Sequence, residues 1–240
     1  TGTSFANGDG DFVNAVVVDA TGNTVVGGVM HYSATASFGG EMATVTGSGM
    51  QNSIILKIDS QGILQWTKHF DSSFLNGVGH IAASPNGDVI VGGGLHTHTM
   101  DADPGPGFVG LTNAGVADAY LVALDSEGAY RWGYSYGSNA EESTGGVTTD
   151  SLGNVYIVAG LGGTHDLDPG VGTVPFTADG NQDLAVISFD EDGVFRWAET
   201  FGGIGSAGGH RLIFDGSGDL VVSGFYETSL TMPDATTVSD

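Results

Sequence analysis

One phrase of about 65 residues recurs along this chain and constrains its fold more than any other feature. In its clearest copy, residues 184–201, an apolar run leads into an acidic turn that ends in glycine, and an aromatic segment with Trp197 follows. The same order of segments leads to Trp66 and to Trp132. A spacing this regular predicts a repeat architecture rather than one irregular domain.

Each copy of the phrase, together with a second pair of apolar runs before it, predicts four short strands joined by tight turns. The 42 glycines and the lack of a long amphipathic helix pattern favour the same structure. We therefore predict an all-β fold, a β-propeller of four-stranded antiparallel blades, as one domain over residues 1–240. The units are expected at approximately residues 6–70, 71–136, 137–201 and 202–240; the last is partial, so we expect the segment to belong to a larger ring.

Most of the predicted turns carry an aspartate three residues before a glycine. Aspartate favours the first position of a type I turn, where its side chain accepts a backbone N–H, and glycine tolerates the left-handed geometry that follows. Much of the acid content is therefore expected to be structural. The hairpin aspartates are Asp19, Asp59, Asp125, Asp150, Asp190 and Asp215.

The charge balance excludes some classes of partner. Acidic residues number 28 and basic residues five, which gives a formal net charge of −23. Nucleic acid is not an expected partner, because phosphate binding needs a basic surface. No apolar run reaches the roughly 20 residues that a membrane span requires. A cationic partner, bound calcium or a high-salt habitat each fits this charge, and charge alone does not rank them.

The recurring tryptophans are interpreted as anchors between blades, and a row of platforms for stacking on sugar rings is the alternative. Small residues after the second strand of each unit are expected to let adjacent blades approach closely. In the first unit, residues 31–49 are expected to form a polar, glycine-rich connection between the second and third strands. The small residues are Gly28, Gly93, Ala159 and Gly224.

Residues 181–190 (NQDLAVISFD), 193–197 (GVFRW) and 150–156 (DSLGNVY) resemble the bacterial β-propeller repeat family known as SBBP. The Asp-x-Asp-Pro-Gly phrases at residues 101–105 and 166–170 resemble connections frequent in that family. The resemblance covers nearly the whole chain. It implies an extracellular or cell-surface bacterial protein and transfers no catalytic residue.

Those two phrases are the candidate metal sites. Carboxylates two residues apart, followed by proline and glycine, offer oxygen ligands to a hard cation such as calcium, which takes about six to eight of them. Calcium is thus the expected cofactor, with Asp101, Asp103, Asp166 and Asp168 as its ligands. The alternative is a turn fixed by proline, with its acids in solvent.

Few other residues suggest chemistry. His80 and His210 stand just before innermost strands and are expected to face the central channel, where a metal or catalytic group would lie. Glu141 and Glu142 suggest glycosidase carboxylates, but adjacent residues on a strand point apart, so a solvated loop is predicted. No nucleophile elbow, zinc-protease motif or phosphate loop occurs.

These features predict a non-enzymatic extracellular or cell-surface module that serves as a scaffold or as a binding or adhesion platform, stabilised by calcium. Its expected partners are a protein or polysaccharide ligand and the remaining blades of a longer chain or of another copy. The alternative is a glycan-active propeller enzyme, a hydrolase or lyase, with carboxylates gathered at the channel mouth.

Overall fold

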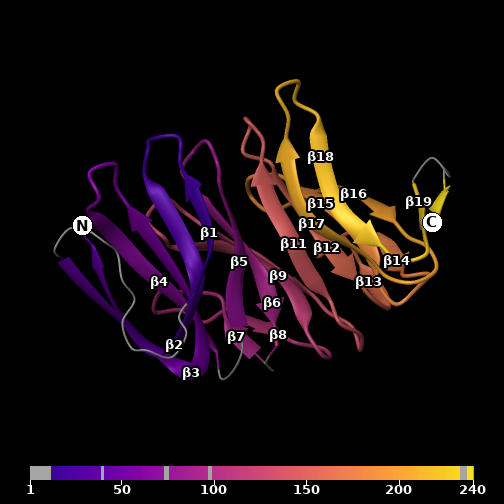
Figure 1. Cartoon of the computed structure of the whole chain (residues 1–240). Coiled ribbons are helices and arrows are strands. Elements are labelled where there is room, and N and C mark those ends of the chain that lie inside the picture. Colours follow the sequence, from indigo (N-terminus) through magenta and orange to yellow (C-terminus); the bar gives the residue numbers. More distant parts are fainter. Residues whose placement is uncertain (1–11, 39–40, 73–75, 97–98, 233–236, 240) are drawn as a thin grey trace.

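The computed structural model describes residues 12–38, 41–72, 76–96, 99–232 and 237–239, and every regular element in these ranges is a β-strand (Figure 1). Sheet 1 contains β1 (Phe12–Val18), β2 (Thr24–Phe38), β3 (Glu41–Ile58) and β4 (Leu64–Ser72), and a hairpin of two short strands pairs with the end of β4 and extends the sheet to six strands. Sheet 2 contains β5 (Asn76–Ala83), β6 (Val89–Leu95), β9 (Asp118–Leu124) and β10 (Tyr130–Tyr136). Sheet 3 contains β11 (Ser143–Thr149), β12 (Val155–Leu161), β15 (Asp183–Phe189) and β16 (Phe195–Phe201), and sheet 4 contains β17 (Ala207–Phe214) and β18 (Leu220–Tyr226).

All neighbouring strands within these sheets run antiparallel, and the sheets stand side by side in an open arc (Figure 1). The first strands of the sheets, β1, β5, β11 and β17, lie next to one another along the inner side. The prediction of an all-β chain with four-stranded antiparallel sheets is confirmed, in a propeller-like arrangement. The arc is not closed over the described residues.

The connections between second and third strands differ from the expectation. Residues 31–49 were expected to form a polar connection, and this prediction is wrong: β2 and β3 remain paired as far as Phe38 and Glu41. In the later units a short hairpin fills this place. These hairpins are β7 (Thr99–Asp101) with β8 (Gly110–Thr112), β13 (Thr164–Asp166) with β14 (Pro175–Thr177), and β19 (Ser229–Thr231) with β20 (Thr237–Ser239).

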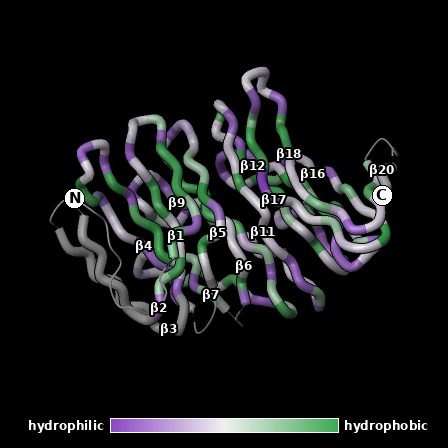
Figure 2. Tube along the Cα trace, viewed as in Figure 1, coloured by the Kyte–Doolittle hydropathy of each residue, from purple (hydrophilic) through white to green (hydrophobic). Residues whose placement is uncertain are grey.

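The core lies between the faces of adjacent sheets rather than at the centre of the arc. All seven residues of β9, β12 and β15 are buried, because their sheets are covered on both faces. This explains why these strands are apolar without alternation, as the hydropathy colours along them indicate (Figure 2). The strands at the two ends of the arc, by contrast, expose apolar side chains such as Val16 and Val221.

The turn chemistry follows the prediction. Asp19 Oδ1 accepts the backbone N–H groups of Thr21 and Asn23, and the Gly22 N–H bonds back to the Asp19 carbonyl. Seven turn glycines have φ of 77° to 92°, a region in which a side chain would be strained. They are Gly22, Gly62, Gly87, Gly128, Gly153, Gly193 and Gly218.

The tryptophans join each sheet to the next. The indole N–H of Trp66 donates to the carbonyl of Ser126, in the outer turn of sheet 2, at 3.0 Å. The indole N–H of Trp132 donates to the carbonyl of Glu191, in the outer turn of sheet 3, at 3.1 Å. Trp197 has no such turn within the described residues, and its exposed fraction is 37%, against 7% for Trp132. The interpretation of Trp66 and Trp132 as anchors is confirmed.

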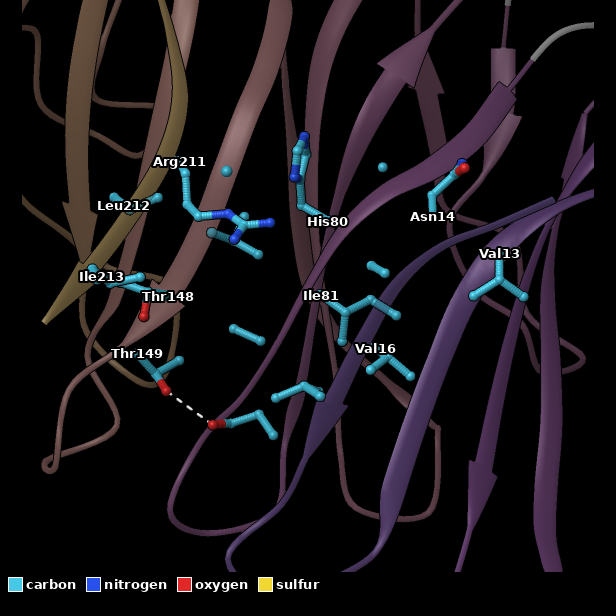
Figure 3. Close-up of a pocket in the computed structure, with 17 residues that line it drawn as sticks. Val13, Asn14, Val16, His80, Ile81, Thr148, Thr149, Arg211, Leu212 and Ile213 are labelled. Carbon is cyan, nitrogen blue, oxygen red and sulfur yellow. Dashed lines mark hydrogen bonds between the residues drawn. The ribbon is translucent and has the colours of Figure 1, made fainter. Parts of the chain in front are cut away.

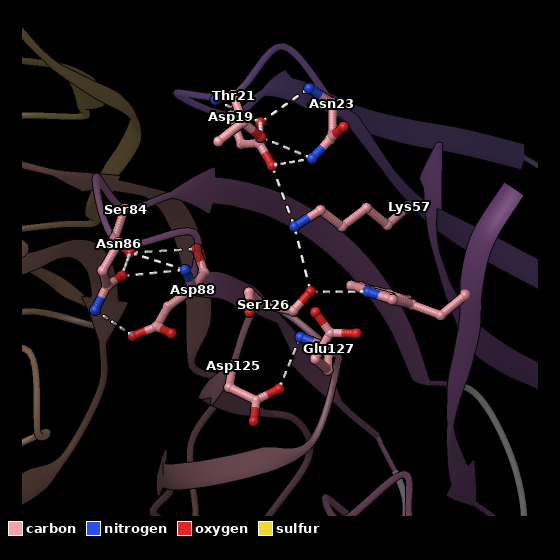
Figure 4. A network of polar contacts seen from close by, with 11 residues as sticks. Asp19, Thr21, Asn23, Lys57, Ser84, Asn86, Asp88, Asp125, Ser126 and Glu127 are labelled. Atoms are coloured by element: carbon pink, nitrogen blue, oxygen red, sulfur yellow. Dashed lines mark hydrogen bonds and ion pairs between the residues drawn. The ribbon is translucent and has the colours of Figure 1, made fainter. Parts of the chain in front are cut away.

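Basic side chains strengthen the same seams. Lys57 lies between sheets 1 and 2, where its Nζ is 3.1 Å from the Asp19 carboxylate and 3.2 Å from the Ser126 carbonyl (Figure 4). Hydrogen bonds from Thr21, Asn23 and Lys57 outweigh the effect of burial and lower the pKa of Asp19. At the next seam Arg131 pairs with Asp88 of its own sheet and, at 2.7 Å, with Asp192 of sheet 3.

Glycines also permit close packing, although not in the predicted way. A Cβ on Gly28 would lie 1.9 Å from the carbonyl oxygen of Phe12, in the same sheet, so this glycine serves the inner strand and not an adjacent blade. The residue before it makes the contact between sheets, because a Cβ on Gly27 would lie 2.3 Å from Ile81. A Cβ on Gly93 or Gly224 would likewise meet the backbone of the first strand of its own sheet. A Cβ on Gly92 would meet side chains of the adjacent sheet, as at Gly27.

Replacing Trp132 by alanine is expected to lower the free energy of unfolding by about 3–5 kcal/mol, because a buried ring and a bond across the seam are both lost. The same change at Trp197, which lacks the bond and is partly exposed, is expected to cost about 1 kcal/mol or less. Urea unfolding of both variants measures the difference. A Trp132→Phe control retains most of the ring volume and isolates the N–H bond; equal losses at Trp132 and Trp197 would contradict the anchor role.

Candidate functional site

A cavity of about 630 Å³ lies along the inner side of the arc (Figure 3). Its walls come from β1, β5, β11 and β17, so all four sheets contribute one strand each. Its polar lining includes Asn14, His80, Thr148, Thr149 and Arg211. None of the described residues that line it is Asp or Glu, although the chain has 28 acidic residues.

A bulge in each inner strand sets which side chains face the cavity. The pairing register shifts between Val78 and His80 in β5 and between Gly209 and Arg211 in β17, and equivalent shifts occur in β1 and β11. A bulge bends its strand and re-aims the residues beside it. His80 and Arg211 thus occupy the same position, directly after the bulge, in sheets 2 and 4.

The expectation for the two channel histidines is half right. His80 lines the cavity, and its pKa is lowered by burial and by the Arg211 guanidinium, against a hydrogen bond with the Thr144 backbone that raises it. His210 is the extra residue at its bulge and is exposed, with its ring 5.3 Å from that of Phe225. Arg211, which the sequence analysis did not select, takes the place expected for His210 (Figure 3).

The candidate calcium ligands occupy two equivalent loops outside this cavity. Asp101 Oδ1 accepts the N–H groups of Asp103 and Val109, and Asp103 Oδ1 accepts the N–H of Gly105. Asp166 and Asp168 make the matching bonds in the next unit. One oxygen of each carboxylate therefore holds its own hairpin. Within the described residues, no three His, Cys, Asp or Glu side chains gather at metal-binding distances.

A buried polar cluster in the seam between sheets 2 and 3 has no parallel elsewhere in the repeat. Glu142 is 1% exposed, so the prediction of a solvated loop is wrong for this residue. Its carboxylate accepts the N–H and the hydroxyl of Ser138 and lies 3.5 Å from Nε2 of His165. Asp118 lies beside them, with Oδ2 bonded to the Ala114 N–H and Oδ1 buried without a hydrogen-bond partner.

Sequence reasoning missed this cluster, although a signal existed. At the position of His165 the neighbouring units have Met100 and Leu230, and at that of Glu142 they have Gly77 and Ala207. A polar residue that the other units replace by an apolar one is not needed by the sheet. This comparison finds His165 and Glu142, but it does not predict that they meet Asp118.

Comparison with known proteins supports the fold at a coarse level. No family model matches the chain. It is 24% identical over 209 residues to an uncharacterized WD repeat-containing protein of Acanthamoeba polyphaga mimivirus, covering 77% of this chain and 15% of that protein. This likeness is to a propeller-type repeat that differs from SBBP, so membership of the SBBP family stays a prediction. In the described part of the chain, no helix is suited by length and hydrophobicity to cross a bilayer.

Asp118 is expected to make stability depend on pH. Burial and the neighbouring Glu142 raise its pKa above the ordinary 3.8, against hydrogen bonds from the backbone that lower it. In the unfolded chain the carboxyl therefore ionises first, so stability is lost as the pH rises from 3.8 through the folded pKa. Asp118→Asn is expected to remove this loss and to stabilise the protein more at neutral pH than near pH 4.

Chemical denaturation at the two pH values measures the effect, and Asn52, buried at the equivalent position of the first unit, indicates that the amide fits. Asp183→Asn is the matched control. Burial raises the pKa of Asp183 as well, but both of its oxygens accept backbone N–H groups, from Asp179 and Gly203, so an amide there loses an acceptor. If Asp118→Asn destabilises the protein as much as Asp183→Asn at neutral pH, the prediction that ionised Asp118 costs stability is wrong.

Proposed function

We propose that this chain is a β-propeller segment, with blades of about 65 residues, that acts as a non-enzymatic binding or scaffold module and holds its ligand in the inner-strand cavity. One observation carries the proposal. The cavity gathers polar side chains that differ between units, above all His80 and Arg211, whereas the repeated residues build turns and seams. Polar residues that the sheets do not need are available for recognition.

The proposed setting is outside the cell or at the cell surface, and the proposed ligand is a protein or a polysaccharide. The resemblance of residues 181–197 to SBBP repeats supports the setting. The acid excess suits a soluble, surface-displayed protein, because a high net charge opposes self-association.

The remaining blades, from a longer chain or from another copy, are further proposed partners. Within the described residues β18 pairs only with β17, whereas the equivalent β12 is paired on both edges. An apolar cavity of about 250 Å³, lined by residues that include Phe201 and Val222, lies beside β18. If a partner completes sheet 4, Trp197→Ala will cost the assembly as much stability as Trp132→Ala; an unchanged small cost in every assembled form contradicts this.

The alternative, a glycan hydrolase or lyase, has less support. A hydrolase of the usual kind needs two carboxylates roughly 5–9.5 Å apart at a site that a sugar can enter. The lining of the inner-strand cavity offers none. Asp118 and Glu142 are neighbouring carboxylates, but each is 1% exposed and so is closed to a polysaccharide.

A polysaccharide and protein-ligand array, followed by analysis of the bound material, tests the proposal. Saturable binding without release of shortened products is expected, since the cavity lining has no acid and base pair for glycoside chemistry. Products that accumulate with time would support the enzyme instead. Absence of saturable binding in the presence of calcium would contradict the binding module.

Calcium at Asp101, Asp103, Asp166 and Asp168 remains part of the proposal, in the role of ordering the two loops. Each of these carboxylates already uses one oxygen internally, so the ion would take the other oxygens and backbone carbonyls. Calcium binding of this kind would be weak, with a Kd of about 1 mM, as in extracellular modules.

Raising calcium from zero, in chelator, to about 10 mM is expected to stabilise the protein by about 1.4 kcal/mol at such a site. Thermal melting measures this shift. Magnesium at the same concentration is the control, because it screens the net negative charge equally but fits these loops poorly. An equal response to magnesium or to monovalent salt would indicate adaptation to salt and contradict the calcium sites.

A further inference from the structure

The basic residues of this chain are few enough to account for individually. There are five, Lys57, Lys68, Arg131, Arg196 and Arg211, against 28 acidic residues. Two of them, Lys57 and Arg131, form ion pairs with carboxylates among the described residues. The surroundings of each of the five indicate its role.

Four of the five are part of the sheets and seams. Lys57 and Arg131 pair with turn acids, as described above. The stem of Lys68 packs against Gly128 in the outer turn of sheet 2. Arg196 donates to the hydroxyls of Tyr156 and Ser188 within sheet 3, at 3.0 and 3.1 Å.

Of the five, Arg211 is the one that lines the inner-strand cavity. Its guanidinium makes no ion pair and no hydrogen bond with any residue that the structure describes, and it extends into the inner-strand cavity towards the strand that carries His80 (Figure 3). The position of Arg211 is taken by Ala15 in the first unit and by Gly146 in the third. Gly146 lies between the His80 and Arg211 positions, so no side chain from β11 fills the space between them.

Burial and, after it, the charge of Arg211 lower the pKa of His80. The described residues that line the cavity contribute no carboxylate to oppose that charge. Several kinds of polar donor, including the guanidinium, face one solvent-filled space. A guanidinium binds carboxylate and sulfate groups through two parallel hydrogen bonds, which makes it the preferred side chain for such anions.

We propose that Arg211, with His80 opposite, binds an oxyanion in the inner-strand cavity, either the carboxylate or the sulfate group of a small ligand. This deepens the proposed binding function, on which it rests, by naming the chemical class of the ligand. The chain is thus expected to repel anions over most of its surface and to admit one anionic group at the centre.

The pKa of the His80 imidazole can report the binding of an anion to Arg211. An anion on Arg211 offsets the positive charge that lowers the pKa of His80, so binding raises that pKa. The experiment follows the His80 ring by NMR over a pH titration, with acetate, sulfate, glucuronate or neutral glucose at up to about 50 mM, enough to saturate a site with a Kd near 1 mM. Sodium chloride keeps the ionic strength equal in every sample.

A saturable rise in the pKa of His80 is expected with the anions and not with glucose. Arg211→Ala is expected to raise the pKa without ligand and to abolish the response, whereas Arg211→Lys retains part of it. Arg196→Ala, a matched change outside the cavity, leaves the response intact. Stronger binding of glucuronate than of acetate assigns the ligand to an acidic sugar, and preference for sulfate assigns it to a sulfate group.

Two results would overturn the proposal: no saturable response to any anion, or an equal response in the wild-type protein and Arg211→Ala, which would mean screening alone. Both are independent of the array experiment. Array binding that survives Arg211→Ala would leave the binding module standing and remove only the anion site. An anion response without array binding would leave the anion site standing and contradict the binding module.

Discussion

The hydrogen bond from a tryptophan to the next sheet's outer turn is the contact on which the rest of the arc depends. Each four-stranded sheet is apolar on both faces and is therefore stable only when a neighbour covers it. Trp66 and Trp132 fix how that neighbour sits, since each buries its ring in the seam and donates its indole N–H to a turn carbonyl. The turn can present that carbonyl only because Asp125 or Asp190 and its paired glycine hold the turn shape.

Charged side chains of these sheets fall into two groups, those whose charge is satisfied by the fold and those whose charge is not. Many acids lie in turns, where backbone N–H groups satisfy them, and the scarce cations Lys57 and Arg131 bind acids of this kind, Arg131 reaching Asp192 across a seam. Asp118 and Glu142 are exceptions, because they share one buried seam with His165. Arg211 is a cation in the inner-strand cavity that meets no acid in the described residues. Glu142, His165 and Arg211 occupy positions that vary between units, where the sheet does not require a particular residue.

Much of the fold could be predicted because the repeat encodes it locally. The turn aspartates, the glycines with positive φ and the seam tryptophans all recur with one period, and each has a local physical reason. The prediction failed where the first unit departs from the repeat, as in the long pairing of β2 with β3. It also failed where a single inserted residue decides which side chain faces the cavity, as with His210. A bulge inserts one residue and reverses which side chain meets the cavity, and no local pattern marks it.

The sequence by itself determined the strands, the turns, the period and the strongly acidic surface, because these follow from neighbours within a few residues or from composition. Only the tertiary structure decided which side chains meet. His80 and Arg211 are about 130 residues apart in the chain and face one cavity only because four inner strands stand side by side. Contacts of that kind depend on how sheets pack and where their bulges fall, and these are set by the whole arc rather than by any one segment.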